Sequence, residues 1–246
     1  MIPKIKSPHE KYKDDHHYEH SEVSILESGL PKPKEFDNVE QARDILFGIL
    51  NENKPDLSVL KIPLQKRAIC FDIDATVLNM VDDENISRLG LFDMYLVYKK
   101  ALELKYEVFF ITARPNVFID EVKKSNILIT QEQLQSAGFT EYTGLALMPE
   151  DITDYTYENI SQYKRDARKL IVSDGFQIVL SCGDQWSDLL TPLSVYEANE
   201  KGNKKFEPMY DFWTLDDKAN FPQNKPILVK NPERGTLWGF KLPADD

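Results

Sequence analysis

Four short apolar runs, separated by longer stretches with helical patterning, restrict the fold of this chain more than any other feature. They cover residues 68–71, 108–111, 145–148 and 178–180, and the last continues to Cys182. Continuous apolar runs of this length are typical of strands buried on both faces, as in a parallel sheet. Their alternation with helices predicts an α/β protein with a doubly wound parallel sheet and right-handed crossovers.

Apolar residues recur at helical spacing in three segments. One helix is predicted over 37–53, where Asp37 can cap its start. A second lies between the first and second apolar runs, and a third lies between the third and fourth. The residues that mark the three helix faces are Val39, Ala42, Ile45, Leu46 and Leu50; Leu91, Tyr95, Tyr98 and Leu102; and Tyr163, Ala167, Leu170 and Ile171.

The 246 residues are enough for one sizeable core and an extension. Residues 1–35 are polar, charged and interrupted by prolines. We therefore expect an N-terminal extension without its own core, followed by one domain over 36–246. The histidines of the chain all lie in this extension, as part of a solvated tail or of a transition-metal site: His9, His16, His17 and His20.

Net charge and hydropathy argue against two classes of binding partner, nucleic acid polymers and membranes. The net charge of −11 opposes binding to nucleic acid polymers, which are anionic themselves. No run approaches the roughly 18 apolar residues of a membrane span, so no membrane partner is expected. The N-terminus lacks the apolar segment of a secretory signal, so the cytoplasm is the default expectation for location. The oligomeric state is left open.

Three of the four apolar runs end in a polar residue suited to chemistry: Asp72, Thr112 and Asp184. In a doubly wound sheet, ligands bind beyond the carboxyl ends of the strands. These residues therefore predict a site at that edge of the sheet.

Asp72 and Asp74 are two residues apart, and both would clash with apolar neighbours if the strand continued. They fit a strand that ends at Asp72 and turns into a loop. Cleavage of a phosphate ester needs a nucleophile and a group that moves a proton. We assign Asp72 as the nucleophile and Asp74 as the general acid and then base. The alternative is a loop whose acids only cap or turn the chain.

Two further residues suit the binding of phosphate. Thr112, with Ala113 beside it, can donate a hydroxyl hydrogen bond to a phosphoryl oxygen, or it can cap a following helix that has Pro115 in its first turn. Lys164 lies at the N-terminal end of a charged helical segment and could reach a phosphate as a point charge. The alternative for Lys164 is a solvated helix face.

Asp184 and Asp188 follow the fourth run after a glycine. Two carboxylates at this spacing suit a hard cation with oxygen ligands, and Mg²⁺ takes one or two carboxylates together with phosphate and water. We expect Asp72, the backbone carbonyl of Asp74 and Asp184 to bind Mg²⁺. Asp188 would lie outside this set and orient Lys164 or a metal-bound water.

Taken together, these motifs resemble those of the haloacid dehalogenase superfamily, in particular class B and class C acid phosphatases and the related plant acid phosphatases and vegetative storage proteins. The resemblance implies a Rossmann-like core, an aspartyl-phosphate intermediate, Mg²⁺ and a small phosphorylated substrate. Two departures stand out. Position 75 is usually acidic in this branch and is Ala75 here, and the short stretch 78–91 leaves room for only a minimal cap. The segments that carry the resemblance are 71–78, 111–114, 163–168, 183–189 and 239–243.

The leading functional hypothesis is therefore a Mg²⁺-dependent acid phosphatase that hydrolyses phosphomonoesters. A 5′-nucleotidase or a phosphotransferase on the same core is the near alternative. A storage or binding protein that kept the fold without activity is a third, which the presence of Asp72 and the other motif acids disfavours.

Cys70 and Cys182 each lie two residues before an acid of the predicted site. If their strands are neighbours, both thiols should lie on one sheet face and close together. We expect them to be reduced, because side chains on adjacent strands are poorly oriented for a disulfide.

Overall fold

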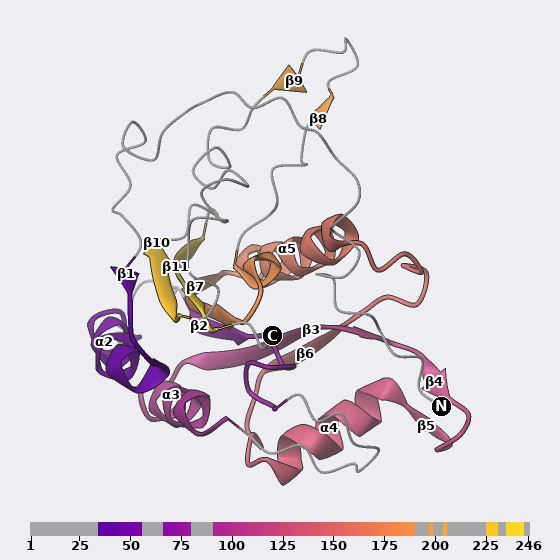
Figure 1. Ribbon diagram of the computed structural model, residues 1–246, viewed down its shortest axis with the longest axis horizontal. Coiled ribbons are helices and arrows are strands. Elements are labelled where there is room, and N and C mark those ends of the chain that lie inside the picture. Colours follow the sequence, from indigo (N-terminus) through magenta and orange to yellow (C-terminus); the bar gives the residue numbers. More distant parts are fainter. Residues whose placement is uncertain are drawn as a thin grey trace.

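The computed structural model describes residues 34–55, 66–79, 91–189, 197–198, 204–205, 225–230 and 235–243. Its centre is a seven-stranded sheet in the order β1-β10-β11-β7-β2-β3-β6 (Figure 1). The strands are β1 (Lys34–Glu35), β2 (Lys66–Phe71), β3 (Glu107–Pro115), β6 (Gly144–Met148), β7 (Phe176–Gly183), β10 (Ile227–Lys230) and β11 (Thr236–Lys241).

Helices cover both faces of this sheet, with α5 on one side and α2 and α3 on the other (Figure 1). The helices are α2 (Val39–Glu52), α3 (Phe92–Glu103), α4 (Asn126–Ser136), α5 (Tyr157–Ser173) and the 3₁₀ turn η2 (Trp186–Asp188). Two small antiparallel pairs complete the described elements: β4 (Phe118–Ile119) with β5 (Lys124–Ser125), and β8 (Glu197–Ala198) with β9 (Lys204–Lys205).

The four predicted apolar runs form β2, β3, β6 and β7, and neighbouring strands from β11 through β7, β2 and β3 to β6 are parallel. This confirms the predicted α/β fold. The complete sheet is mixed, because β10 is antiparallel to β11 and β1 is antiparallel to β10. Since β3 and β7 flank β2 on opposite sides, the strand order reverses beside β2, and such a reversal opens a crevice at the carboxyl ends of the strands.

The structure corrects two details of the predicted helices. The residue that caps α2 is Asn38 and not Asp37, because the Asn38 side chain accepts a hydrogen bond of 2.8 Å from the backbone N–H of Gln41. Leu170 does not face the core: it is 69% exposed, while Ala167 and Ile171 form the buried stripe of α5.

The core between the sheet, α2 and α3 contains a cluster of aromatic rings. The ring of Phe139 lies 5.0 Å from that of Tyr98 on α3 and 5.9 Å from that of Phe110 on β3, measured between centroids. All three side chains are buried, and burial of each stabilises the folded state by about 1.5–3 kcal/mol relative to leaving it exposed. The cluster fixes β3, and with it the strand end that carries Thr112, against α3.

A β-bulge in β7 overturns part of the expectation for the thiols. Ala68 pairs with Ile178 but Ile69 pairs with Leu180, so Val179 is an extra residue. Cys182 therefore lies beside Phe71 rather than Asp72, and Cys70 lies beside Ser181. Because side chains alternate along a strand, the two cysteines leave opposite faces of the sheet. Both are buried and both are thiols, as predicted.

Helix α3 ends in a conformation that its sequence does not favour. The N–H of Lys105 donates to the carbonyl of Leu102 and that of Tyr106 to Ala101, each at 3.0 Å, which is the hydrogen-bond pattern of a Schellman motif. Lys105 has φ +63°, whereas glycine occupies the corresponding position after α4 (Gly138, φ +92°) and after α5 (Gly175, φ +88°). Lys105 thus holds a left-handed conformation that glycine adopts without strain.

We expect Lys105→Gly to raise the free energy of unfolding by about 0.5–1 kcal/mol, because it relieves this backbone strain at an exposed position. Urea denaturation followed by circular dichroism measures the change. The reverse substitution, Gly175→Lys, serves as the matched control and should lower stability. Equal or lower stability of Lys105→Gly would contradict the backbone assignment at the end of α3.

Two sequence expectations fall largely outside the described residues, and a third is not tested. The histidine-rich segment lies outside them, as do residues 80–90, on which the expected minimal cap depends. The domain boundary at residue 36 stays a prediction, although β1 already joins the sheet at Lys34. Among the described helices, none is both long and apolar enough to cross a membrane.

Candidate active site

The carboxyl ends of β2 and β7 lie side by side at the point where the strand order reverses. Asp72 directly follows β2, and its backbone N–H donates to the carbonyl of Cys182 at 2.8 Å. Asp184 directly follows β7. The parallel pairing of two strands thus places these two acids at one edge of the sheet, as the sequence predicted.

The chain turns sharply after Asp72. The N–H of Ala75 donates to the carbonyl of Leu78, and the N–H of Leu78 donates to that of Ile73, at 2.8 and 2.9 Å. Ala75 has φ +57°, so it occupies the left-handed region in this turn. The turn carries Asp74 away from the sheet, as predicted from the clash that a continued strand would create.

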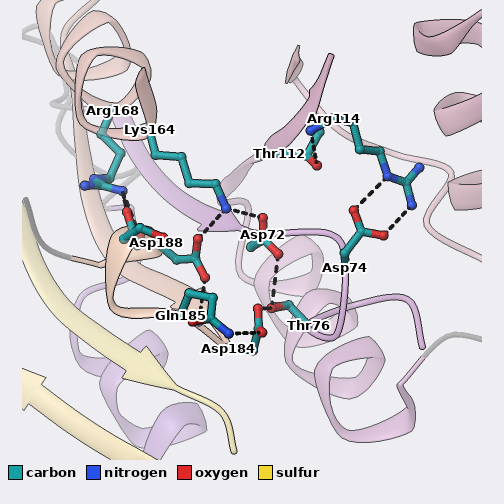
Figure 2. Close-up of polar contacts among 11 residues, drawn as sticks. Asp72, Asp74, Thr76, Thr112, Arg114, Lys164, Arg168, Asp184, Gln185 and Asp188 are labelled. Carbon is teal, nitrogen blue, oxygen red and sulfur yellow. Dashed lines mark hydrogen bonds and ion pairs between the residues drawn. The ribbon is translucent and has the colours of Figure 1, made fainter. Parts of the chain in front are cut away.

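Lys164, from the first half of α5, extends between two carboxylates (Figure 2). Its Nζ lies 2.6 Å from Oδ1 of Asp72, and it also contacts Oδ1 of Asp188. The Lys164 residue is only 4% exposed. The solvated-face alternative for Lys164 is therefore wrong, because the N-terminal turns of α5 lean over the ends of β2 and β7.

Asp188 and Asp184 are held by the turn after β7. The backbone N–H of Gln185 donates to Oδ2 of Asp188 at 2.9 Å, and its side-chain amide donates to Oδ2 of Asp184 at 2.8 Å. Gly183 is required here, because a Cβ on it would lie 2.1 Å from the Cβ of Asp188. Both oxygens of Asp188 thus already accept hydrogen bonds from the protein.

Burial raises the pKa values of the two acids that end the strands. The pKa of Asp72 rises to about 7: burial is the main cause, Lys164 opposes it, and the charges of Asp188 and Asp184 add to it. Burial, with the charge of Asp188, raises the pKa of Asp184 to about 6. Burial alone would lower the pKa of Lys164, but Asp188 and Asp72 outweigh it and raise that pKa. The charged forms of both acids are therefore disfavoured in the metal-free protein, mainly because the carboxyl groups are buried.

This arrangement fits a divalent cation. Carboxylate oxygens of Asp72, Asp184 and Asp188 lie within 4.8 Å of one another. Such clustered oxygens are the ligands that hard cations select. A bound cation would stabilise the charged forms of these acids against both burial and their mutual repulsion. Asp72 and Asp184 have the better claim as ligands. Both oxygens of Asp188 accept hydrogen bonds from Lys164 and Gln185. Among the described residues, Oδ2 of Asp72 and Oδ1 of Asp184, by contrast, have only long contacts to Thr76, of 3.5 and 3.4 Å.

The remaining predicted residues come from β3 and from the turn after β2. Thr112 is buried on β3, and its Oγ1 accepts a hydrogen bond of 3.2 Å from the N–H of Arg114. Thr112 does not cap a helix, because β3 continues to Pro115 and α4 begins only at Asn126. Ala113 follows Thr112 on the same strand. The carboxylate of Asp74 lies outside the cluster and binds Arg114 (Figure 2).

The sequence did not single out several residues that complete the site. Thr76 Oγ1 lies 3.5 Å from Asp72 and 3.4 Å from Asp184, so it bridges the ends of the two strands. Arg168, one turn after Lys164, donates to the carbonyl of Asp188 at 2.8 Å. Both lie inside segments that carry the family resemblance, so their motif positions were the available signal.

A buried lysine lies behind the acid cluster. Lys241, on β11, pairs in register with Gly183, and its Nζ donates to the carbonyl of Leu242 at 3.0 Å. Burial lowers its pKa, while Asp184 and Asp188 oppose this shift. A lone lysine within an apolar strand was the sequence signal for it.

The raised acid pKa values predict how the stability of metal-free protein depends on pH. Asp72 and Asp184 titrate above their ordinary value of 3.8, so between about pH 4 and 7 the folded state binds more protons than the unfolded state. Their contribution to stability is complete below that window and is lost as pH rises through it. In EDTA, thermal unfolding should therefore occur at a lower temperature at pH 7.5 than at pH 5, and Mg²⁺ should narrow the gap. A higher unfolding temperature at pH 7.5 in EDTA would contradict these shifts.

Comparison with known proteins identifies the family. Residues 90–213, half of the chain, match the model of HAD superfamily, subfamily IIIB (acid phosphatase). The chain therefore belongs to this subfamily of the haloacid dehalogenase superfamily, as its motifs predicted. The match includes Thr112, Lys164, Asp184 and Asp188, while Asp72 and Asp74 precede it.

Curated relatives come from plants. Acid phosphatase 1 of Solanum lycopersicum is 31% identical over 160 residues, covering 57% of each chain. A stem 31 kDa glycoprotein of Glycine max is 34% identical over 46% of this chain and 39% of its own, and vegetative storage protein 2 of Arabidopsis thaliana is 30% identical over 44% and 37%. This chain thus spans little more than half the length of the tomato relative. A solved class C acid phosphatase from Bacillus anthracis with tungstate bound is 17% identical, with a TM-score of 0.40 over 75% of this chain and 76% of its own.

Proposed function

We propose that this chain is a Mg²⁺-dependent phosphomonoesterase in which Asp72 attacks phosphorus and becomes the aspartyl-phosphate. One observation carries the proposal: Asp72 is a buried carboxylate at a strand end, in contact with the buried Lys164 and within the acid cluster that fits a cation. Family membership and the acid phosphatase among the relatives support the same reaction.

The residues of the chain take distinct parts in the first half of the reaction. An oxygen of Asp72 forms a bond to phosphorus while the bond from phosphorus to the leaving oxygen breaks. Asp74 donates a proton to that leaving oxygen, which departs as the free alcohol. Lys164 and the hydroxyl of Thr112, with the neighbouring backbone at Ala113, bind the other phosphoryl oxygens.

In the second half, water attacks the phosphorus of the aspartyl-phosphate and Asp74 takes the proton that water loses. The bond from phosphorus to Asp72 breaks, which releases inorganic phosphate and restores the carboxylate. Asp188 keeps Lys164 beside Asp72 throughout, because its other oxygen is fixed by Gln185.

Mg²⁺ would be held by Asp72, Asp184 and the backbone carbonyl of Asp74, and it would neutralise the charge between the attacking carboxylate and the phosphoryl group. The substrates proposed are small phosphomonoesters. A nucleotide among them is an outcome that a substrate panel decides, and an acidic pH optimum is a property that the same panel measures.

The test is a panel of aryl, sugar and nucleoside phosphates assayed with Mg²⁺ across pH, with and without EDTA. The expected result is Mg²⁺-dependent release of phosphate, and acid quenching of turnover should trap a phosphoenzyme that hydroxylamine cleaves, as an acyl phosphate requires. Turnover that EDTA does not lower would overturn the role of the cation. No turnover of any member would favour a non-catalytic protein of the kind that the names of the vegetative storage relatives describe.

A further inference from the structure

Arg114 makes a two-point contact with Asp74 through adjacent nitrogens of its guanidinium (Figure 2). Its Nε donates to Oδ2 of Asp74 and its Nη2 donates to Oδ1, both at 2.8 Å. This parallel geometry fixes a carboxylate in direction as well as in distance, which a single-point contact to lysine cannot do. The carboxyl of Asp74 is therefore oriented even though it is 29% exposed.

The other side of the same guanidinium is held by α4. Nη1 of Arg114 donates to Oγ1 of Thr130 at 3.0 Å and to Oε1 of Gln133 at 2.7 Å. These two residues are three apart, so they share one face of α4. Thr130 is fully buried and the Arg114 side chain is only 11% exposed. Hydrogen bonds to α4 thus hold the guanidinium on the side opposite Asp74.

Charge is retained in this buried arrangement. Burial lowers the pKa of Arg114 to about 10, and the charge of Asp72 opposes the shift. A guanidinium with this pKa is still charged at neutral pH. In addition, the backbone N–H of Arg114 donates to Oγ1 of Thr112. The backbone of Arg114 is thus hydrogen-bonded to one of the residues proposed above to bind phosphate.

We propose that Arg114, supported by Thr130 and Gln133 of α4, is a positioning residue that aims the carboxyl of Asp74 at the leaving oxygen. This inference rests on the proposed function, in which Asp74 moves the proton. Helix α4 contributes none of the reacting groups, but through Thr130 and Gln133 it would set the direction of proton transfer.

Positioning of Asp74 can be distinguished from phosphate binding, because only the positioning role has an effect that depends on the leaving group. An alkoxide leaves poorly without a proton, whereas p-nitrophenolate leaves well without one, so the position of Asp74 matters most for alkyl esters. A residue that binds the phosphoryl group would affect both kinds of ester alike, and its loss would weaken binding of inorganic phosphate.

The experiment compares Arg114→Lys with the parent enzyme on p-nitrophenyl phosphate and on glycerol 2-phosphate, with Mg²⁺ present. Lysine keeps the charge but not the two-point contact. We expect kcat on the alkyl ester to fall at least about tenfold more than kcat on the aryl ester, because misplacement of a catalytic group by about 1 Å can cost 100-fold. The inhibition constant of inorganic phosphate should change less than about threefold. Thr130→Val should shift the ratio of the two kcat values in the same direction by a smaller factor.

Two further variants make the result decisive. Arg43→Lys alters another arginine–carboxylate pair, in which Nη1 of Arg43 on α2 lies 2.8 Å from Oδ1 of Asp93 on α3. This variant should leave kcat on both substrates unchanged. Arg114→Ala should regain part of its alkyl-ester turnover when guanidinium ions are added at concentrations too low to unfold the protein, which a purely structural role would not produce.

The outcomes are distinguishable. Equal loss on both esters together with weaker inhibition by phosphate would overturn the inference and make Arg114 a phosphate ligand. Unchanged kinetics of Arg114→Lys would overturn it as well, while the proposed function stands. If Asp74→Asn itself shows no greater loss on the alkyl ester, the acid role of Asp74 in the proposed function fails, and the inference fails with it.

Discussion

The Asp72→Asn variant is expected to lose at least about a thousandfold of turnover on any phosphomonoester and yet to unfold at the same temperature as the parent or higher. Activity falls because an amide cannot form the bond to phosphorus, and loss of a nucleophile is among the costliest single changes in an enzyme. Stability is kept because burial and the neighbouring acids already disfavour the Asp72 carboxylate, as its raised pKa shows. Asparagine has the same shape without the charge, and Lys164 keeps its contact with Asp188.

Phosphate release measured with Mg²⁺ present, and calorimetry of the metal-free protein, check the two halves of this prediction. Asp166→Asn, an exposed change on α5, is the matched control and should alter neither quantity. Full turnover by Asp72→Asn would remove Asp72 as the nucleophile. A large loss of stability at unchanged secondary structure would show that the Asp72 carboxylate stabilises the fold, contrary to what its raised pKa implies.

Lys164→Met is expected to lose both activity and stability. Lys164 is buried and contacts Asp72 and Asp188. Its removal leaves two buried carboxylates without their cation, a kind of change that costs about 3–5 kcal/mol. The cost should shrink as pH falls from 7.5 towards 5, because without Lys164 the carboxyl group of Asp72 takes up a proton more readily than it does in the unfolded chain. Binding of inorganic phosphate should weaken as well.

Urea denaturation at both pH values measures the loss. Lys169→Met, five residues further along α5 at an exposed position, should change stability by less than about 0.5 kcal/mol. If Lys164→Met were as stable as the parent at pH 7.5, the contacts of Lys164 would contribute nothing net to the fold. A loss that did not diminish at pH 5 would point to packing, rather than charge, as its cause.

The sequence predicted the part of the site that follows from strand ends. Apolar runs identify buried strands, and parallel strands bring their carboxyl ends to one edge, so Asp72 and Asp184 had to meet if β2 and β7 were neighbours. Lys164 was harder to place, because hydropathy cannot separate a lysine that covers a strand end from one that faces solvent. Family resemblance, rather than the charge pattern, favoured the buried position.

Other parts of the structure could not be predicted from spacing. Strand β3 runs to Pro115, beyond its apolar run, and this extension gives Arg114 its position near α4. The residues that hold Arg114 come from a helix with no periodic apolar face to reveal it, since only Thr130 and Leu134 of α4 are buried. The bulge at Val179 could not be predicted either, because Val179 and both of its neighbours are apolar and buried, so nothing in the run marks the extra residue.

That bulge has a consequence for the redox behaviour of the protein. Cys70 and Cys182 leave opposite faces of one sheet, with the paired backbones of β2 and β7 between them. A disulfide needs its two Cβ atoms about 3.5–4.5 Å apart and pointing towards each other, so an oxidant could join these sulfurs only after the central strands of the sheet had separated. The site built on those strands should therefore keep its shape in both reducing and oxidising surroundings.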